Sequence, residues 1–159
     1  MNDEKLLRRA IEIAQNAREH GNHPFGALLA DADGNILLEA ENTVVTTKDI
    51  TAHAELNLIR QASNKFTPEV LKECTLYTST EPCPMCAGAI FWSDVGRVVY
   101  ALSEEGLYEM TGETPYELAL PCRDVFARGT HPVEVIGPLL EEEARQVHLN
   151  FWRKNDESP

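Results

Sequence analysis

Short apolar runs alternate along this chain with segments in which apolar residues recur every three or four positions. Runs of strand length cover residues 75–79, 97–102 and 133–136, and helical spacing covers residues 52–62 and 84–92. A short apolar run predicts a buried strand, and a 3.6-residue period predicts a helix. Chains that alternate strand and helix fold into layers, with helices packed on a sheet that contains parallel strands. The pattern therefore predicts an α/β fold.

The N-terminal part of the chain adds one helix and one hairpin to this pattern. Apolar residues at helical spacing predict an amphipathic helix over residues 5–19, and Gly21 follows it as a C-cap. Two apolar runs, residues 25–30 and 36–40, flank the turn-forming residues 31–35. We expect a β-hairpin there, which makes the predicted sheet mixed.

The C-terminal part is less regular. Residues 103–130 carry glycine, proline and aromatic side chains without a clean period, so we expect a long functional loop. Residues 139–152 regain helical spacing after an acidic first turn, which predicts a closing helix. No repeat or low-complexity linker divides the chain. We therefore expect one domain over residues 1–154 and a short polar tail at residues 155–159.

The net charge of the chain indicates which classes of partner are favoured. The 159 residues include 14 basic and 26 acidic side chains, which gives a formal charge of −12. A nucleic-acid surface needs clustered Lys and Arg, so RNA is the less favoured partner. No apolar run approaches the ~18 residues that span a bilayer, and the N-terminus lacks a secretory pattern. These features predict a cytoplasmic protein without a membrane partner.

Two short segments, Thr-Ala-His-Ala-Glu and Glu-Pro-Cys-Pro-Met-Cys, carry residues that bind metals. The C-x-x-C spacing of Cys83 and Cys86 at a helix start puts both sulfurs on one face, where the helix N-terminus favours thiolates. With His53 they make three ligands, and an open fourth position is typical of catalytic zinc. Two alternatives stay open, namely simple buried thiols and a structural zinc site with Cys74 or Cys122 as fourth ligand.

Glu55 stands two residues after the histidine and is the candidate base. Two thiolates neutralise the charge of Zn²⁺, so a bound water needs a neighbouring group to take its proton. Residues two apart on a helix are turned by about 200° from each other. His53 and Glu55 can therefore flank one ion only beyond the helix N-terminus. Asp49 and Thr51 are available as N-caps, which would place His53 in the first turn.

These segments resemble the signature of the zinc-dependent cytidine deaminase-like superfamily, H-x-E followed by P-C-x-x-C. Residues 24–27, Asn42 and residues 81–90 are also similar to the branch that holds bacterial guanine deaminases and tRNA adenosine deaminases. The resemblance covers about residues 5–102. It implies a three-layer α/β/α sandwich with a mixed sheet of about five strands, and a homodimer or larger assembly.

The resemblance also implies roles for individual residues. One zinc ion per chain would be held by His53, Cys83 and Cys86, with Glu55 as the proton shuttle. The residues implied for substrate binding are Asn42, which would hydrogen-bond the base, Phe25, which would lie against its ring, and the backbone around Ala54 and Thr80. For Asn42 the alternative is a turn residue at the end of a strand, and for Phe25 it is a core residue.

The acidic stretch 103–117 bears on the substrate. It holds five acidic residues and no Lys or Arg, whereas each phosphate contact needs a cation. We therefore favour a free purine-like base over adenosine in tRNA, with guanine giving xanthine and ammonia. Glu113 and Glu117 are candidates to accept hydrogen bonds from a ring N–H and an exocyclic amine. A tRNA adenosine deaminase, an aminotriazine or modified-base deaminase, and a catalytically silent zinc-scaffold subunit remain as alternatives.

Overall fold

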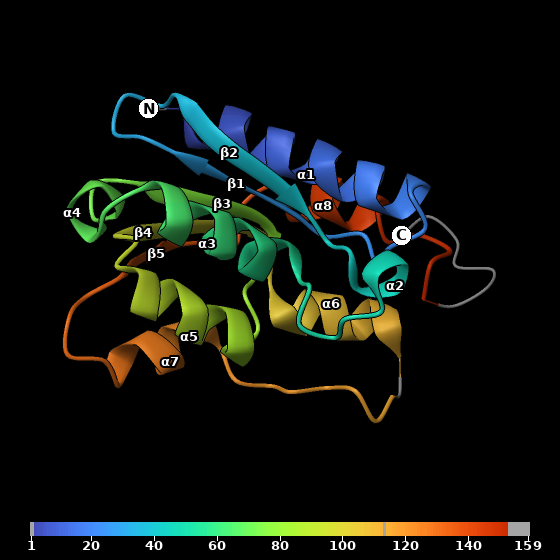
Figure 1. The fold of residues 1–159 in the computed structure, drawn as a ribbon. Coiled ribbons are helices and arrows are strands. Elements are labelled where there is room, and N and C mark those ends of the chain that lie inside the picture. The colour runs from blue at the N-terminus through green and yellow to red at the C-terminus, as the bar shows by residue number, and fades with distance from the viewer. Residues whose placement is uncertain (1, 113, 153–159) are drawn as a thin grey trace.

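The computed structural model describes residues 2–112 and 114–152. A five-stranded sheet with the order β2-β1-β3-β4-β5 lies between two layers of helices (Figure 1). β1 pairs antiparallel with β2 and β3, and β3, β4 and β5 run parallel. The predicted α/β/α sandwich with a mixed sheet is confirmed. The strands are β1 (Gly26–Ala30), β2 (Ile36–Glu41), β3 (Thr75–Thr80), β4 (Arg97–Leu102) and β5 (Glu134–Ile136).

Helices α1 and α8 cover one face of the sheet, and α3, α5 and α7 cover the other (Figure 1). Gly21, with φ of +93°, follows the end of α1 as predicted. The helices are α1 (Asp3–Glu19), α2 (Val44–Thr47), α3 (Ala54–Lys65), α4 (Pro68–Leu71), α5 (Pro84–Ser93), α6 (Glu104–Thr111), α7 (Cys122–Ala127) and α8 (Glu141–Gln146). Among the described residues, no helix has the length and apolar character needed to cross a membrane.

The two faces of the sheet bury separate apolar cores. Successive side chains of a strand point to opposite faces. Accordingly, Leu76 of β3 joins the core that contains Leu58 of α3 and Ile90 of α5, whereas Tyr77 joins the core that contains Leu7 of α1. Every residue of β3 is buried, as expected for a central strand covered on both faces. This strand leads directly into the segment that carries the cysteines.

The prediction of a long irregular loop over residues 103–130 is wrong, because α6 and α7 lie within it. These helices have eight and six residues, too few to show a clear apolar period. Their N-termini are instead held by a distant carboxylate. Glu81 accepts the backbone N–H of Glu104 at 3.0 Å and that of Cys122 at 2.9 Å, and these are the first residues of α6 and α7.

The closing helix is also shorter than the predicted 139–152. Leu140, just before α8, has a left-handed backbone with φ of +56°, which a regular helix excludes. After α8, the guanidinium of Arg18 donates to the carbonyl oxygens of Val147 and Leu149 at 2.9 and 2.6 Å. A longer helix would use these carbonyls internally, so the contact with α1 stabilises a turn in their place. The predicted polar tail at residues 155–159 lies outside the described residues.

Candidate metal centre

The N-termini of α3 and α5 bring the predicted metal ligands together. His53 is the N-cap residue of α3, Cys83 is the N-cap residue of α5, and Cys86 lies in the first turn of α5. The Nδ1 atom of His53 is 3.5 Å from Sγ of Cys83 and 3.6 Å from Sγ of Cys86. All three ligand atoms lie within 4.8 Å of one another. Residues 30 positions apart in the chain thus converge on one point.

The spacing of these three atoms fits zinc. Tetrahedral coordination with Zn–N of about 2.0 Å and Zn–S of about 2.3 Å places a nitrogen and a sulfur ligand about 3.5 Å apart. Within the described part of the chain, Cys74 and Cys122 are not members of the cluster. Both are buried, and the thiol of Cys74 donates to the carbonyl of Val70 instead. Three ligands from the protein leave one tetrahedral position for water or substrate.

The protonation of the two thiols also favours a cation. The pKa of Cys83 is lowered because its sulfur accepts hydrogen bonds from Cys86 and His53, although burial opposes the shift. The pKa of Cys86 is raised because it donates to Cys83 and is buried. The hydrogen bond with Cys83 raises the pKa of His53. The cluster therefore favours a thiolate at Cys83, at the N-terminus of α5, and a thiolate is the form of cysteine that binds a divalent cation.

Glu55 is the second residue of α3 and is buried beside the ligands. Burial raises the pKa of its carboxyl to about 7, and the charge of Cys83 adds to the effect while that of His53 opposes it. A carboxyl with this pKa both accepts and donates a proton near neutral pH. The position of His53 at the N-cap puts its ring at the end of the helix, as the sequence argument required for two residues that flank one ion.

The predicted N-caps of this helix are wrong. The carboxylate of Asp49 accepts the N–H of Thr51 at 2.9 Å and its hydroxyl at 2.6 Å, which closes the turn before α3. Side chains that bond locally in this way compete with capping further along the chain. The helix begins after His53, whose own side chain makes no capping bond and is free to bind the metal.

Asn42 lies at the end of β2, and its side chain is oriented by its own turn. The residue is buried, and its Oδ1 accepts the backbone N–H of Val44 at 3.0 Å. This is the turn role that sequence analysis held as an alternative. With Oδ1 engaged in the turn, Nδ2 is the part of the amide that we expect to bond a substrate, and it can act only as a donor.

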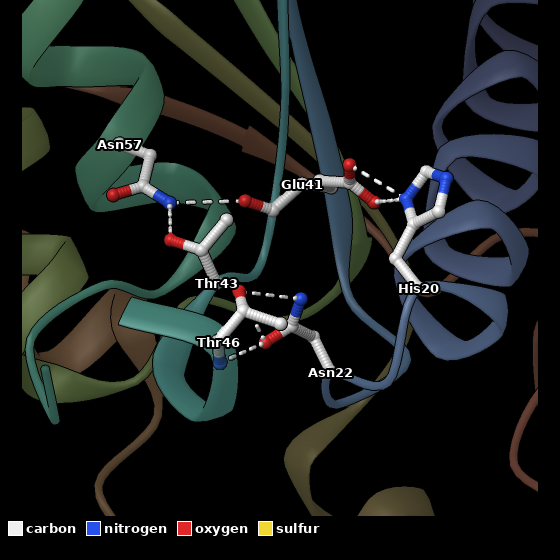
Figure 2. Close-up of polar contacts among 6 residues, drawn as sticks. All are labelled: His20, Asn22, Glu41, Thr43, Thr46 and Asn57. Atoms are coloured by element: carbon white, nitrogen blue, oxygen red, sulfur yellow. Dashed lines mark hydrogen bonds and ion pairs between the residues drawn. The ribbon is translucent and has the colours of Figure 1, made fainter. Parts of the chain in front are cut away.

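A polar network fixes the loop between β2 and α3 (Figure 2). Asn22, at the end of α1, accepts the backbone N–H groups of Val45 and Thr46, the first at 3.1 Å and the second at 3.0 Å, and so holds α2. Asn57 of α3 donates to the carbonyl of Glu41 and to the hydroxyl of Thr43, both at 3.0 Å. Neither asparagine could be predicted from the sequence, because each acts through partners outside its own element.

An aromatic group lies next to Phe25. The Phe25 ring centroid is 5.5 Å from that of His148 and 6.0 Å from that of Trp152, whose indole N–H donates to Nδ1 of His148 at 2.9 Å. His23 also contacts the indole, at 5.5 Å between centroids. Burial lowers the pKa of His23, and the charge of His53 lowers it further. Sequence analysis assigned no role to these two histidines.

The other predicted substrate contacts occupy different environments. Ala54 and Thr80 are buried at the start of α3 and the end of β3, and Oγ1 of Thr80 has no hydrogen-bond partner within the described protein. Such a buried hydroxyl is available to a ligand. Glu117 is exposed in the segment between α6 and α7, and Glu113 lies outside the described residues. The role of either glutamate therefore stays a prediction.

The chain is similar in sequence to known deaminases. The model of the cytidine and deoxycytidylate deaminase zinc-binding region matches residues 1–102. The chain is 44% identical over 153 residues to the probable cytosine deaminase of Schizosaccharomyces pombe, covering 94% of this chain and 92% of that protein. It is 46% identical over 102 residues to the guanine deaminase of Bacillus subtilis, covering 64% and 65%. It is 37% identical over 158 residues to the tRNA-specific adenosine deaminase of Haemophilus influenzae, covering 98% and 86%.

Solved structures agree with these sequence matches. A guanine deaminase from Nitrosomonas europaea superposes with a TM-score of 0.74 and 25% identity, covering 90% of this chain and 80% of that one. A tRNA:A34 deaminase superposes with a TM-score of 0.71 and 28% identity, covering 91% and 99%. Relatives that act on different bases thus share the fold, so the fold alone does not select the substrate.

Proposed function

The chain belongs to the zinc-dependent deaminase family defined by the cytidine and deoxycytidylate deaminase zinc-binding region, and from this premise we propose that it deaminates a free nucleobase. The observation that carries the proposal is the position of the buried Glu55 beside the cluster of His53, Cys83 and Cys86. A structural zinc site has no need of a buried carboxyl at that position. The same carboxyl argues against a catalytically silent scaffold subunit.

The reaction adds water to the amino-bearing ring carbon and releases ammonia. Zinc held by the three ligands would make the attacking water acidic enough to act near neutral pH. Glu55 carries two protons in succession. The first passes from the attacking water to the ring nitrogen, and the second passes from the hydroxyl added to the carbon to the amine, so the carbon–nitrogen bond breaks as ammonia leaves and a carbonyl forms. The pKa of about 7 that burial gives this carboxyl suits transfer in both directions.

The remaining residues bind and orient the base. Nδ2 of Asn42 donates to a carbonyl or imine acceptor on the ring, since its Oδ1 is bound to Val44. The buried hydroxyl of Thr80 and the backbone N–H of Ala54, which starts α3, contact the base edge. Phe25 packs on the ring. A base with an acceptor adjacent to the reacting carbon fits these donors.

Guanine is the first substrate we propose, giving xanthine and ammonia. The 46% identity to the Bacillus subtilis guanine deaminase over 102 residues supports this choice. The formal charge of −12 argues against tRNA, because binding an RNA backbone needs clustered cations. Glu113 and Glu117 remain proposed acceptors for the N–H groups of a purine.

Cytosine is the second candidate, giving uracil and ammonia. The observation that favours it is the match to the Schizosaccharomyces pombe probable cytosine deaminase, which extends over nearly the whole length of both proteins. That match includes the C-terminal third of the chain, where Trp152 and His148 approach Phe25. If Trp152 and His148 determine which base is bound, we expect cytosine to be preferred over guanine.

A substrate panel tests the proposal. Ammonia release is measured with guanine, cytosine, adenine, an aminotriazine, adenosine and tRNA, using protein that holds one zinc per chain. We expect turnover of a free base and little or none of tRNA. Activity on tRNA alone would overturn the proposed substrate class. Glu55→Gln should keep the metal and lower kcat by about 10³-fold or more, since the shuttle is lost; normal turnover by this variant would remove Glu55 from its role.

We also propose that the protein is a cytoplasmic homodimer. Trp92 on α5 is 82% exposed, and Met85 on the same helix is partly exposed. Exposed apolar side chains grouped on one helix are typical of a contact surface between proteins. Sedimentation analysis of the wild type and of Trp92→Lys checks this, with dimer expected for the first and monomer for the second.

A further inference from the structure

The amide of Asn57 occupies the narrow space between the end of β2 and the start of α3 (Figure 2). Its Nδ2 lies 3.0 Å from the carbonyl oxygen of Glu41, 3.0 Å from Oγ1 of Thr43 and 3.3 Å from the carbonyl oxygen of Ala52. Its Oδ1 accepts from Nη1 of Arg60 at 3.1 Å. Two amide hydrogens thus serve three acceptors, and the whole side chain is used.

These acceptors flank the two residues that matter most for the proposed reaction. Glu41 and Thr43 stand on either side of Asn42, and Ala52 immediately precedes His53. The N–H of Thr43 also donates to the carbonyl of Ala52 at 3.0 Å, which closes the loop at its base. Asn57 therefore joins the segment that carries the base-binding amide to the segment that carries a metal ligand.

We propose that Asn57 is a positioning residue for substrate binding, which fixes Nδ2 of Asn42 relative to the metal ligand His53. The inference rests on the proposed function, because it assumes that Asn42 binds the base. The loop from residue 43 to residue 52 contains only the four-residue helix α2, so contacts at its two ends determine its register. Displacement of Asn42 by a fraction of an ångström weakens its bond to the base but leaves the metal cluster intact.

Only a side chain with two donors at this length can make the contacts. In Asn57→Asp a carboxylate of the same shape faces the carbonyl oxygens of Glu41 and Ala52, so attraction becomes repulsion at these two contacts, and only the hydroxyl of Thr43 can still bond it. In Asn57→Leu the volume is nearly kept and the donors are lost without added charge. Two matched controls are present in the chain. Arg60→Ala removes only the contact at Oδ1, and Asn64→Asp makes the same amide-to-carboxylate change at an exposed site of α3.

The kinetic test separates positioning from general stability. With the base that the wild type turns over, Asn57→Asp should raise KM by about tenfold, with kcat within about threefold and one zinc per chain retained. Asn57→Leu should show a smaller rise, and Arg60→Ala and Asn64→Asp should match the wild type. A double variant with Asn42→Ala should have the KM of Asn42→Ala alone, because Asn57 acts through Asn42. Independent effects that multiply, or a loss confined to kcat or zinc, would overturn the proposal.

A second measurement does not depend on activity. Hydrogen exchange of residues 42–53 in the zinc-loaded protein should be faster in Asn57→Asp and Asn57→Leu than in the wild type or in Asn64→Asp. Unchanged exchange in both variants overturns the role of Asn57 whatever the kinetics show. If the wild type deaminates no base yet the exchange rises as expected, the proposed function fails while the positioning of Asn42 by Asn57 stands.

Discussion

The two faces of the sheet differ in the kinds of side chain that they carry. On the face covered by α3 and α5, helix N-termini point at one place and bring the ligand atoms of His53, Cys83 and Cys86 within 4.8 Å of one another. On the face covered by α1 and α8, apolar residues fill the core, and ion pairs such as Arg9–Glu39 and Arg97–Asp3 lie at its rim. Both faces bury apolar cores, but the metal ligands lie on the α3 and α5 face, so substitutions in the two layers should have distinct effects.

The largest expected effect is on the α3 and α5 face. Cys83→Ser should lose stoichiometric zinc and reduce deamination by 10³-fold or more, because serine is not a thiolate ligand at neutral pH. Metal analysis and ammonia release on the folded protein check this. The matched control is Cys74→Ser, whose thiol lies away from the cluster. Equal zinc contents in the two variants would contradict the assignment of Cys83 as a metal ligand.

On the other face, Leu7→Ala should affect stability and leave the chemistry unchanged. Leu7 of α1 is fully buried, and truncation of such a side chain costs about 2–5 kcal/mol of unfolding free energy. Urea denaturation measures the loss, and the fraction that stays folded should keep one zinc per chain. Lys5→Ala, an exposed position of the same helix, should change stability by less than about 0.5 kcal/mol. Loss of zinc from folded Leu7→Ala would show that the layers are coupled.

His148, which follows α8, should make the free energy of unfolding depend on pH. Burial lowers the pKa of this imidazole to about 3, and the charges of Arg18 and Arg145 add to the effect. An unfolded histidine binds its proton near pH 6.5, so its contribution is complete above that pH and is lost as the pH falls toward 3. Stability should fall by up to about 1.4 kcal/mol per pH unit in this range.

Replacement of the His148 imidazole tests whether stability falls with pH for this reason. The stability of His148→Leu should depend less steeply on pH between about 6.5 and 4 than that of the wild type, as measured by urea denaturation at each pH. A slope in His148→Leu equal to that of the wild type would show that other groups dominate acid unfolding.

The sequence predicts the parts of this structure that depend on local pattern. The layers, the mixed sheet and the cluster of His53, Cys83 and Cys86 follow from apolar periods and from two short motifs. The pattern does not predict the N-cap of α3, because Asp49 closes a turn instead, and it does not predict α6 and α7, which are too short to show a period. In each case a contact outside the element decides where it begins.

The missed contacts have long sequence separations. Glu81 and Cys122 are 41 positions apart, and Arg18 and Val147 are 129 positions apart. No window of sequence contains both partners, so neither the start of α7 nor the end of α8 could be predicted from periodicity. The same limit applies to the substrate, because the residues around Phe25 come from the chain's two ends.

The smallest expected effect lies at the rim of the α1 face. Arg9 donates to both carboxylate oxygens of Glu39 on β2, at 2.6 and 2.9 Å, yet both side chains are about one-third exposed. Solvent and salt screen such a pair, and exposed pairs contribute about 0.2–1 kcal/mol. Arg9→Gln should therefore lower the unfolding free energy by about 0.5 kcal/mol at low salt and by less in 1 M NaCl, with zinc content and KM unchanged. A change in KM would mean that the rim of one layer reaches the site on the other.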